Sequence, residues 1–278
     1  MLMGYGDEIM ITGYAKELKR KYPNHQVVAG NRKKGVIVDT IIFNNNPNIK
    51  RFSELKNTQT IWIDSYSGHR PYFTKETDEK YYWNEKHKSI PGELYFSKEE
   101  EMFGSNIILD AKKWWKKNKK NNFEKIIFIE PSRIKTIKSN SFENRNWGID
   151  KWQSFIDNFK NEYLFIQSVF SGSDFLEGIY SFKSNFREAC AVIKSSDFII
   201  GMEGGFTHAT AAVNKTGLFI YGGYIDPKVI GYSQHRNIYI DIDGSPCGMK
   251  IICEHCKKCN EIITVDMIAE NFLEMISV

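Results

Sequence analysis

The sequence lacks the features that mark membrane-spanning, secreted and nucleic-acid-binding proteins. No apolar run approaches the ~20 residues that a membrane-spanning helix needs. The opening MLMGYGDEIM has no cationic stretch followed by an apolar one, so we expect no signal peptide. The net charge of +4 is mild, and no recognisable motif gathers the basic residues on one face. These absences predict a cytoplasmic protein that accepts anionic ligands and does not bind nucleic acid.

Cysteine is scarce outside one short segment. Four of the five cysteines lie between residues 247 and 259, which argues against a disulfide framework. They form the pattern C-x5-C-x2-C-x2-C, which could surround one structural zinc or iron ion, with reduced thiols or a local disulfide as alternatives. The candidate metal ligands are Cys247, Cys253, Cys256 and Cys259. Cys190, on the apolar face of an expected helix, is predicted to lie in the core.

What is present is a globular α/β pattern. With 41% hydrophobic and 26% charged residues, 278 residues could form one large domain or two of ordinary size. Expected strands and helices alternate, which predicts βαβ units and a largely parallel sheet. The expected strands are 26–30, 36–43, 60–66, 125–131, 162–169, 197–201, 217–223 and 237–243. The expected helices are 7–22, 107–118, 150–160, 186–195, 205–214 and 265–276.

The composition changes at residues 112–125, KKWWKKNKKNNFEK, which are polar and rich in lysine. We expect a boundary there between two α/β domains, residues 1–120 and 121–278. The run KKWWKKNKK is most simply a solvated helix face beside two packing tryptophans. The alternatives are a basic surface for anionic lipid at the inner face of the membrane and contact with nucleic acid phosphates.

The most informative stretch is residues 195–223, SSDFIIGMEGGFTHATAAVNKTGLFIYGG. A buried strand runs into MEGG, then into a small-residue helix and another strand, and ligands of open α/β sheets bind at such loops. The two glycines allow close approach, and the first N–H groups of the helix would face a phosphate or diphosphate. Glu203 suits a hydroxyl-rich group such as a sugar. The predicted donor-site residues here are Glu203, Gly204, Gly205, Phe206, Thr207 and His208; the small residues also suit tight packing, and His208 alone would more often pack than react.

A second glycine turn opens the sequence. Gly4 and Gly6 precede Asp7 at the start of an expected helix, within GYGDEIMITGYAKELKRKYPN. The simplest interpretation is that the Asp7 carboxylate caps this helix by accepting backbone N–H groups. A reactive carboxylate beside a ligand is the alternative.

These motifs resemble glycosyltransferase family 9, the ADP-heptose:lipopolysaccharide heptosyltransferases. The family signature is roughly D-[ST]-G-x-x-H-x-x-A-A, and it aligns with Glu203, Gly204, Gly205, His208, Ala211 and Ala212, with Glu203 in place of Asp and Gly204 in place of a hydroxyl residue. Residues 4–24 resemble the family opening G-x-G-D, and NRNWGIDKWQSFID resembles its K-x-W-P-x-x-x-W segment. The similarity runs in one order along nearly the whole chain.

The resemblance implies a GT-B architecture of two Rossmann-like domains facing a cleft, with the acceptor on the first and the nucleotide-sugar donor on the second. It implies that Asp7 is the general base of an inverting transfer, that Arg145 replaces a phosphate-binding lysine, and that Ser132 is a hydroxyl donor near the phosphates. Transfer would need no cofactor, although some relatives bind iron near the cysteines. Only three residues precede Gly4, so the family's first strand is missing or lies before the recorded start.

The favoured prediction is therefore a glycosyltransferase of lipopolysaccharide-like biosynthesis that uses ADP-heptose or a related donor. The acceptor would be a glycan, a lipid-linked saccharide or a protein hydroxyl. Residues 67–105, whose pattern predicts no regular secondary structure, would determine which acceptor is used. A catalytically degenerate relative that binds nucleotide or glycan is the second hypothesis, motivated by the missing strand and the altered signature. A metal-stabilised nucleic-acid binder ranks third.

Overall fold

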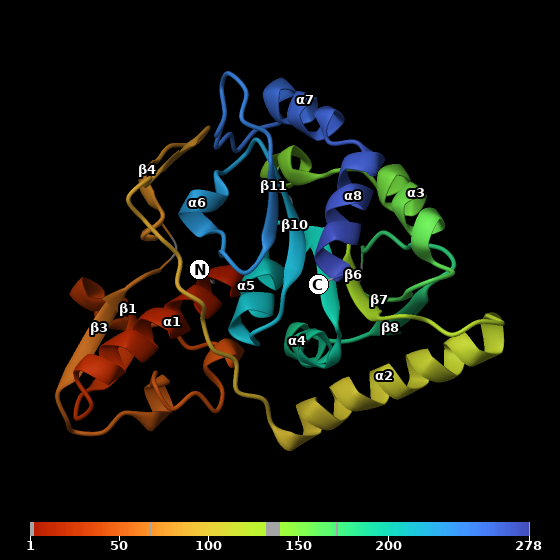
Figure 1. Cartoon of the computed structure of the whole chain (residues 1–278). Helices are drawn as coiled ribbons and strands as arrows, with labels where there is room; N and C mark the ends of the chain where they lie inside the picture. The colour runs from red at the N-terminus through yellow and green to blue at the C-terminus, as the bar shows by residue number, and fades with distance from the viewer. Residues whose placement is uncertain (1–2, 67, 132–139, 171, 278) are drawn as a thin grey trace.

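The computed structural model describes residues 3–66, 68–131, 140–170 and 172–277, with the side chains of 140–142 also left aside. Ser132 lies outside the described residues, so its expected role stays a prediction. Within the described part, no helix combines the length and apolar composition that crossing a membrane would require. Two sheets and a small hairpin form the framework, as Figure 1 shows.

The second half of the chain is built on a six-stranded sheet in which every pairing is parallel, with strand order β11-β10-β9-β6-β7-β8. The strands are β6 (Ile126–Glu130), β7 (Leu164–Val169), β8 (Tyr180–Lys183), β9 (Phe198–Met202), β10 (Gly217–Gly222) and β11 (Arg236–Tyr239). The sequence predicted all of these except β8, which is short and half exposed. The parallel sheet expected from the strand and helix alternation is confirmed here.

Helices cover both faces of this sheet, which explains why its strands are apolar throughout. Along β6, Phe128 faces one core while Ile127 and Ile129 face another. The first core contains residues of α2 (Lys98–Asn118), α4 (Phe186–Ser195) and α5 (Gly205–Ala212); the second contains residues of α3 (Ile149–Phe159) and α8 (Val265–Ile276), as Figure 1 shows. Cys190 is fully buried in the first core, as predicted.

The first half carries a smaller, mixed sheet. Its order is β2-β1-β3, in which β1 (Gln26–Asn31) pairs parallel with β3 (Thr60–Asp64) and antiparallel with β2 (Val36–Ile37). The long strand expected at 36–43 is wrong, because a 3₁₀ turn at Ile41–Phe43 follows Thr40 and buries Ile42 and Phe43 under α1 (Tyr5–Lys21). A full Rossmann-like sheet is therefore seen only in the second half, and the boundary after residue 120 stays a prediction.

Three further elements escaped the sequence analysis. The hairpin of β4 (Phe73–Glu76) and β5 (Tyr81–Trp83) lies within the unreadable segment 67–105. The helices α6 (Pro227–Ile230) and α7 (Glu254–Ile262) are short and follow the last parallel strands. Their patterns are too short for a periodicity of apolar residues to show.

The lysine-rich run forms the end of α2, whose tryptophans turn inward. Trp115 is buried and donates from Nε1 to the carbonyl of Asn121 at 2.6 Å, and Trp114 packs beside Tyr180. Gly104 of the same helix crosses α4 so closely that a Cβ there would lie 2.7 Å from the Ala191 carbonyl oxygen. The lysines of the run are exposed apart from the half-buried Lys119, so the predicted solvated lysine face beside two packing tryptophans is confirmed.

Arg187 ties the two halves of the molecule together. Its side chain is 3% exposed and binds both carboxylate oxygens of Glu100, at 2.6 and 2.8 Å. The same guanidinium donates to the carbonyls of Ile41 at 3.1 Å and Tyr95 at 2.6 Å. One buried cation therefore satisfies acceptors on α2, on the segment before it and in the first half of the chain.

We expect Arg187→Met to lower the free energy of unfolding by about 3 kcal/mol, because it removes the cation paired with the Glu100 carboxylate and a donor to the carbonyls of Tyr95 and Ile41. Lys194→Met is the matched control, since Lys194 pairs with Glu101 at 2.8 Å between the same two helices but is 49% exposed. That change should cost less than about 1 kcal/mol. Urea unfolding measures both, and equal losses would contradict the assigned role of Arg187.

Candidate active site

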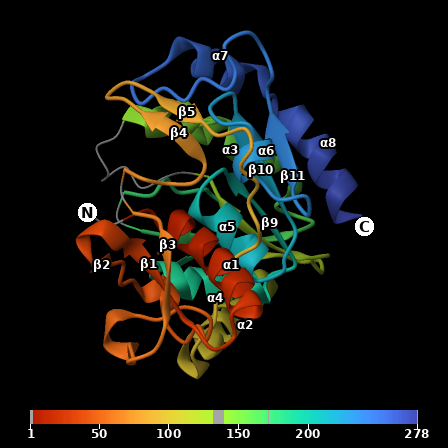
Figure 2. The same cartoon turned by 90° about the vertical axis from the view of Figure 1, so that its left-hand side faces the viewer.

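The N-terminal turns of α1 and α5 meet at the junction of the two halves (Figure 2). A Cβ on Gly6 would lie 2.7 Å from the His208 ring and 3.3 Å from the Cα of Gly205, so only glycine fits. Gly4 is the N-cap of α1, and its N–H donates to Asp7 Oδ2 at 3.2 Å. The capping role predicted for Asp7 is therefore present in the structure.

The Asp7 carboxylate also has two partners that the sequence did not suggest. Tyr72 donates its hydroxyl to Asp7 Oδ1 at 2.5 Å, and Arg70 Nε lies 3.2 Å from Oδ2. The Asp7 side chain is 11% exposed. Burial raises its pKa, against the opposing effects of Arg70, Tyr72 and the Gly4 N–H, and the negative charge of Glu203 raises it further. Asp7 is thus a buried carboxylate oriented by a phenol and a guanidinium.

The facing half contributes Glu203 and Arg145. Glu203 follows β9 directly and binds Arg145 with an Oε2 to Nη1 distance of 3.0 Å. The Arg145 guanidinium also lies over the ring of Tyr224, 4.6 Å from its centre. Burial disfavours the charge of Arg145, but Glu203 and Tyr224 outweigh it and raise its pKa.

Asp7 and Glu203 thus share one cluster in which two carboxylates are balanced by two arginines. The sequence predicted Asp7, Glu203 and Arg145, and the fold brings all three together. The sequence offered no specific signal for Arg70 and Tyr72 beyond the polar and aromatic character of residues 67–105, and none for Tyr224. The roles of these residues depend on contacts between segments that are distant in sequence.

The other predicted donor residues line the start of α5. Gly204 donates its N–H to Thr207 Oγ1 at 3.1 Å, and the Phe206 ring stacks on Phe186 within the core. His208 is buried, and its Nδ1 is hydrogen-bonded to the Tyr232 hydroxyl at 2.8 Å. The His208 side chain is therefore a buried packing residue, as the simpler interpretation expected. Contacts between a ligand and the N-terminal residues of α5 stay a prediction.

Glu8 is a buried carboxyl that the sequence analysis did not single out. Thr40 donates its hydroxyl to Glu8 Oε2 at 2.6 Å, and the residue is 1% exposed. Burial raises the pKa of Glu8 to about 7, with a smaller contribution from Asp7. Its helical spacing from Ile11 and Ala15, three and seven residues on, was the available signal that it faces inward.

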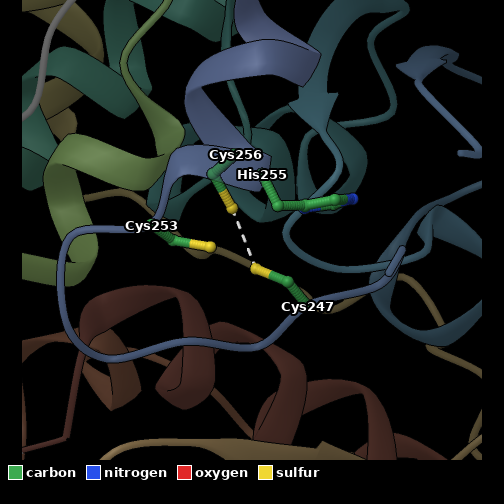
Figure 3. A group of neighbouring side chains, drawn as sticks. All are labelled: Cys247, Cys253, His255 and Cys256. Atoms are coloured by element: carbon green, nitrogen blue, oxygen red, sulfur yellow. Dashed lines mark hydrogen bonds between the residues drawn. The ribbon is translucent and has the colours of Figure 1, made fainter. Parts of the chain in front are cut away.

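The cysteine segment, residues 247–259, forms a separate compact cluster. The ligand atoms of Cys247, Cys253, His255 and Cys256 all lie within 4.8 Å of one another, and Figure 3 shows the three sulfurs converging. The sulfurs of Cys247 and Cys256 are 2.8 Å apart. His255 thus joins the group in the place expected for Cys259, whose sulfur lies 3.7 Å from His255 Nε2.

This donor set, which we call the Cys/His cluster, could bind a metal. Metal–sulfur bonds of about 2.3 Å and metal–nitrogen bonds of about 2.0 Å put tetrahedral donors roughly 3.5–3.8 Å apart, so small side-chain movements would complete the site. Three thiolates and an imidazole suit zinc or iron. The sequence contained one signal for this ligand, because His255 lies directly before Cys256 within the cysteine segment.

Comparison with known proteins gives a fold likeness. No family model and no curated protein matches the chain. Among solved structures, the glycosyltransferase family 9 protein from Veillonella parvula superposes with a TM-score of 0.59 at 14% identity, over 97% of this chain and 93% of its own. The iron-containing dodecameric glycosyltransferase TibC from enterotoxigenic E. coli gives 0.60 at 11% identity, over 99% and 74%.

A further structure, of the TibC heptosyltransferase in complex with ADP-D-β-D-heptose, gives a TM-score of 0.57 at 11% identity, over 97% of this chain and 73% of the other. The structural neighbours are thus family 9 glycosyltransferases with nearly full coverage of this chain, which confirms the resemblance seen in the sequence at the level of the fold.

We expect the pH dependence of stability to reveal Glu8. Because its folded pKa of about 7 exceeds the unfolded value near 4.5, protonation stabilises the folded state. This contribution is fully present below about pH 4.5 and is lost as the pH rises through about 7. Relative to Glu8→Gln, which cannot ionise, the wild type should lose roughly 3 kcal/mol over that range.

Urea unfolding at several pH values measures this difference. Glu17→Gln, on the same helix but 48% exposed, should follow the wild-type curve. Parallel curves for Glu8→Gln and the wild type would contradict a buried, protonated Glu8.

Proposed function

We propose that this chain is an inverting glycosyltransferase that moves a heptosyl group from ADP-heptose to a hydroxyl of a glycan, a lipid-linked saccharide or a protein. The observation that carries the proposal is the meeting of Asp7 with Arg145 and Glu203 where two helix N-termini converge. A carboxylate for the acceptor and a cation for the donor are what such a transfer needs. The likeness to family 9 structures, one of them in complex with ADP-D-β-D-heptose, supports it.

On the donor side, Arg145 and the first N–H groups of α5 would bind the diphosphate. Arg145 is held by Glu203 and by the face of Tyr224, so its guanidinium is oriented before ligand arrives. The helix N-terminus adds partial positive charge. These groups would stabilise the negative charge that grows on the leaving nucleoside diphosphate, and Glu203 would accept hydrogen bonds from sugar hydroxyls.

On the acceptor side, Asp7 would act as the general base. Its carboxylate takes the proton of the acceptor hydroxyl while that oxygen bonds to the anomeric carbon. The bond from this carbon to the diphosphate oxygen breaks, and its electron pair leaves with ADP. Burial raises the pKa of Asp7 and so strengthens it as a base, while Tyr72 and Arg70 orient the carboxylate.

A second candidate function is binding of nucleotide or glycan without transfer. One observation favours it: the Asp7 oxygens already accept the Gly4 N–H and the Tyr72 hydroxyl and face Arg70. To accept a proton from an acceptor hydroxyl, an Asp7 oxygen would have to lose or share one of these hydrogen-bond partners. The altered signature residues Glu203 and Gly204 point in the same direction.

Transfer as proposed requires no cofactor, since Arg145 and backbone N–H groups meet the charge of the leaving group. The Cys/His cluster would hold a structural zinc or iron ion through Cys247, Cys253, His255 and Cys256, with Cys259 as the neighbouring thiol. A metal there would cross-link the loop before α7 to that helix. The iron-containing TibC supports this part of the proposal.

We expect Asp7→Asn to slow ADP release from ADP-D-β-D-heptose by roughly 10²- to 10⁴-fold, with water or an added glycan as acceptor, because the amide cannot take the proton. The dissociation constant for ADP should change less than about threefold, since Asp7 does not contact the diphosphate in this mechanism. A coupled assay of ADP release and isothermal titration calorimetry measure the two quantities.

Glu8→Gln is the matched control, because it neutralises the neighbouring carboxyl, which faces Thr40 instead of the cluster. It should release ADP at the wild-type rate. A wild type that binds ADP but releases none from the sugar nucleotide would favour the second candidate, and full activity in Asp7→Asn would exclude Asp7 as the base.

A further inference from the structure

Asn144, the residue before Arg145, is committed to the loop of the Cys/His cluster. It is 2% exposed. Its Nδ2 donates to the carbonyls of Met249 at 2.9 Å and Ile251 at 2.7 Å, and its Oδ1 accepts the N–H of Cys253 at 2.9 Å. Both amide hydrogens and the amide oxygen are thus used on one five-residue stretch of loop. The position of this loop and the position of Asn144 therefore fix each other.

A second set of contacts leads from the same cluster to the other side of Arg145. Cys247 donates its N–H to the carbonyl of Gly223 at 3.0 Å, and Gly248 donates to that of Tyr224 at 3.1 Å. The Tyr224 ring is the surface on which the Arg145 guanidinium rests. Besides its ion pair with Glu203, Arg145 is placed by Asn144, its neighbour in sequence, and by the Tyr224 ring, and both of these residues are hydrogen-bonded to the cluster loop.

The loop is also bound to the β4–β5 hairpin, since Tyr81 donates its N–H to the carbonyl of Gly248 at 2.9 Å and Lys250 pairs with Glu76 at 2.9 Å. Between β11 and α7 the described residues form no strand, and Cys253, the N-cap of α7, makes no side-chain capping bond. A metal ion bound by Cys247 from the loop and by Cys253 and Cys256 at the start of α7 would close a ring across this segment. Closing such a ring removes conformational freedom that the metal-free loop keeps.

We infer that metal binding at the Cys/His cluster and nucleotide diphosphate binding at Arg145 are energetically coupled, with Asn144 as the positioning residue between them. This inference rests on the proposed function, because it assumes that Arg145 binds the diphosphate. An ion in the cluster fixes the loop, the loop fixes Asn144 and Tyr224, and these hold Arg145 in its binding position. The coupling requires no movement of the acceptor residues.

Coupling of this kind is reciprocal, which separates it from a purely structural role of the metal. If the ion tightens ADP binding by a given factor, ADP must tighten binding of the ion by the same factor. A cluster that only stabilises the fold would raise the melting temperature but leave the ADP dissociation constant of the folded protein unchanged.

The test starts from the purified full chain, stripped of metal with a chelator under reducing conditions and reloaded with Zn²⁺ or Fe²⁺. Isothermal titration calorimetry gives the ADP dissociation constant of each form, and competition with a chromogenic chelator gives the metal dissociation constant with and without ADP. We expect reloading to tighten ADP binding about tenfold, and ADP to tighten metal binding by the same factor.

The variants isolate Asn144. In Asn144→Ala, both ligands should bind, but the effect of each on the other should fall clearly below the wild-type factor, with the route through Tyr224 remaining; Asn144→Asp, which keeps the acceptor for Cys253, serves if the alanine variant does not fold. Asn146→Ala is the matched control, because Asn146 lies on the other side of Arg145, is exposed, and has its side chain hydrogen-bonded to Glu143 and to the N–H of Gly148 within its own turn. It should keep the full coupling.

Each outcome has a distinct meaning. Equal ADP affinity with and without metal would overturn the coupling and leave the proposed function standing, as would failure to bind either ion. Coupling that is undiminished in Asn144→Ala would overturn the role of Asn144. Absence of ADP binding in every form would overturn the proposed function and this inference with it.

Discussion

The structure depends on the close approach of two helix N-termini, those of α1 and α5, at Gly6. Any side chain at that position would collide with His208 or with the backbone of Gly205. The approach brings together two regions of partial positive charge, and Asp7 and Glu203 lie where those regions meet. Two carboxylates buried this close would repel, and Arg70 and Arg145 restore the balance. One steric requirement thus produces a buried cluster of opposite charges drawn from both halves of the chain.

Much of this arrangement could be predicted from the sequence, because local patterns carry it. Strands such as β6, β9 and β10 are apolar on both faces, so they stand out as buried parallel strands. The glycines around Asp7 and Glu203 mark backbone that must come close to something. The hairpin β4–β5, together with Arg70 and Tyr72, could not be predicted, because its partners lie in α1 and near Tyr224, far away in sequence.

Local packing explains why His255 and not Cys259 completes the Cys/His cluster. The Cys259 sulfur packs against Gly223, where a Cβ would lie only 2.3 Å from it, whereas a ring nitrogen of His255 lies within 4.8 Å of the sulfurs of the other three ligands. Cys253 and Cys256 are three apart and share a side. The regular C-x2-C spacing suggested four equivalent thiols, whereas the fold uses three and an imidazole, and through Asn144 the same cluster reaches the residue next to Arg145.

The claim that both halves form one site for a nucleotide diphosphate sugar is tested most directly by thermal unfolding with ADP, UDP, GDP and CMP, on the wild type and on Arg145→Ala. Ligand at a hundredfold excess over its dissociation constant stabilises the native state by about 2.7 kcal/mol, which is a readily measured rise in Tm. We expect a rise in Tm with ADP that is lost in Arg145→Ala. No rise with any of the four nucleotides, or an equal rise in Arg145→Ala, would contradict the claim.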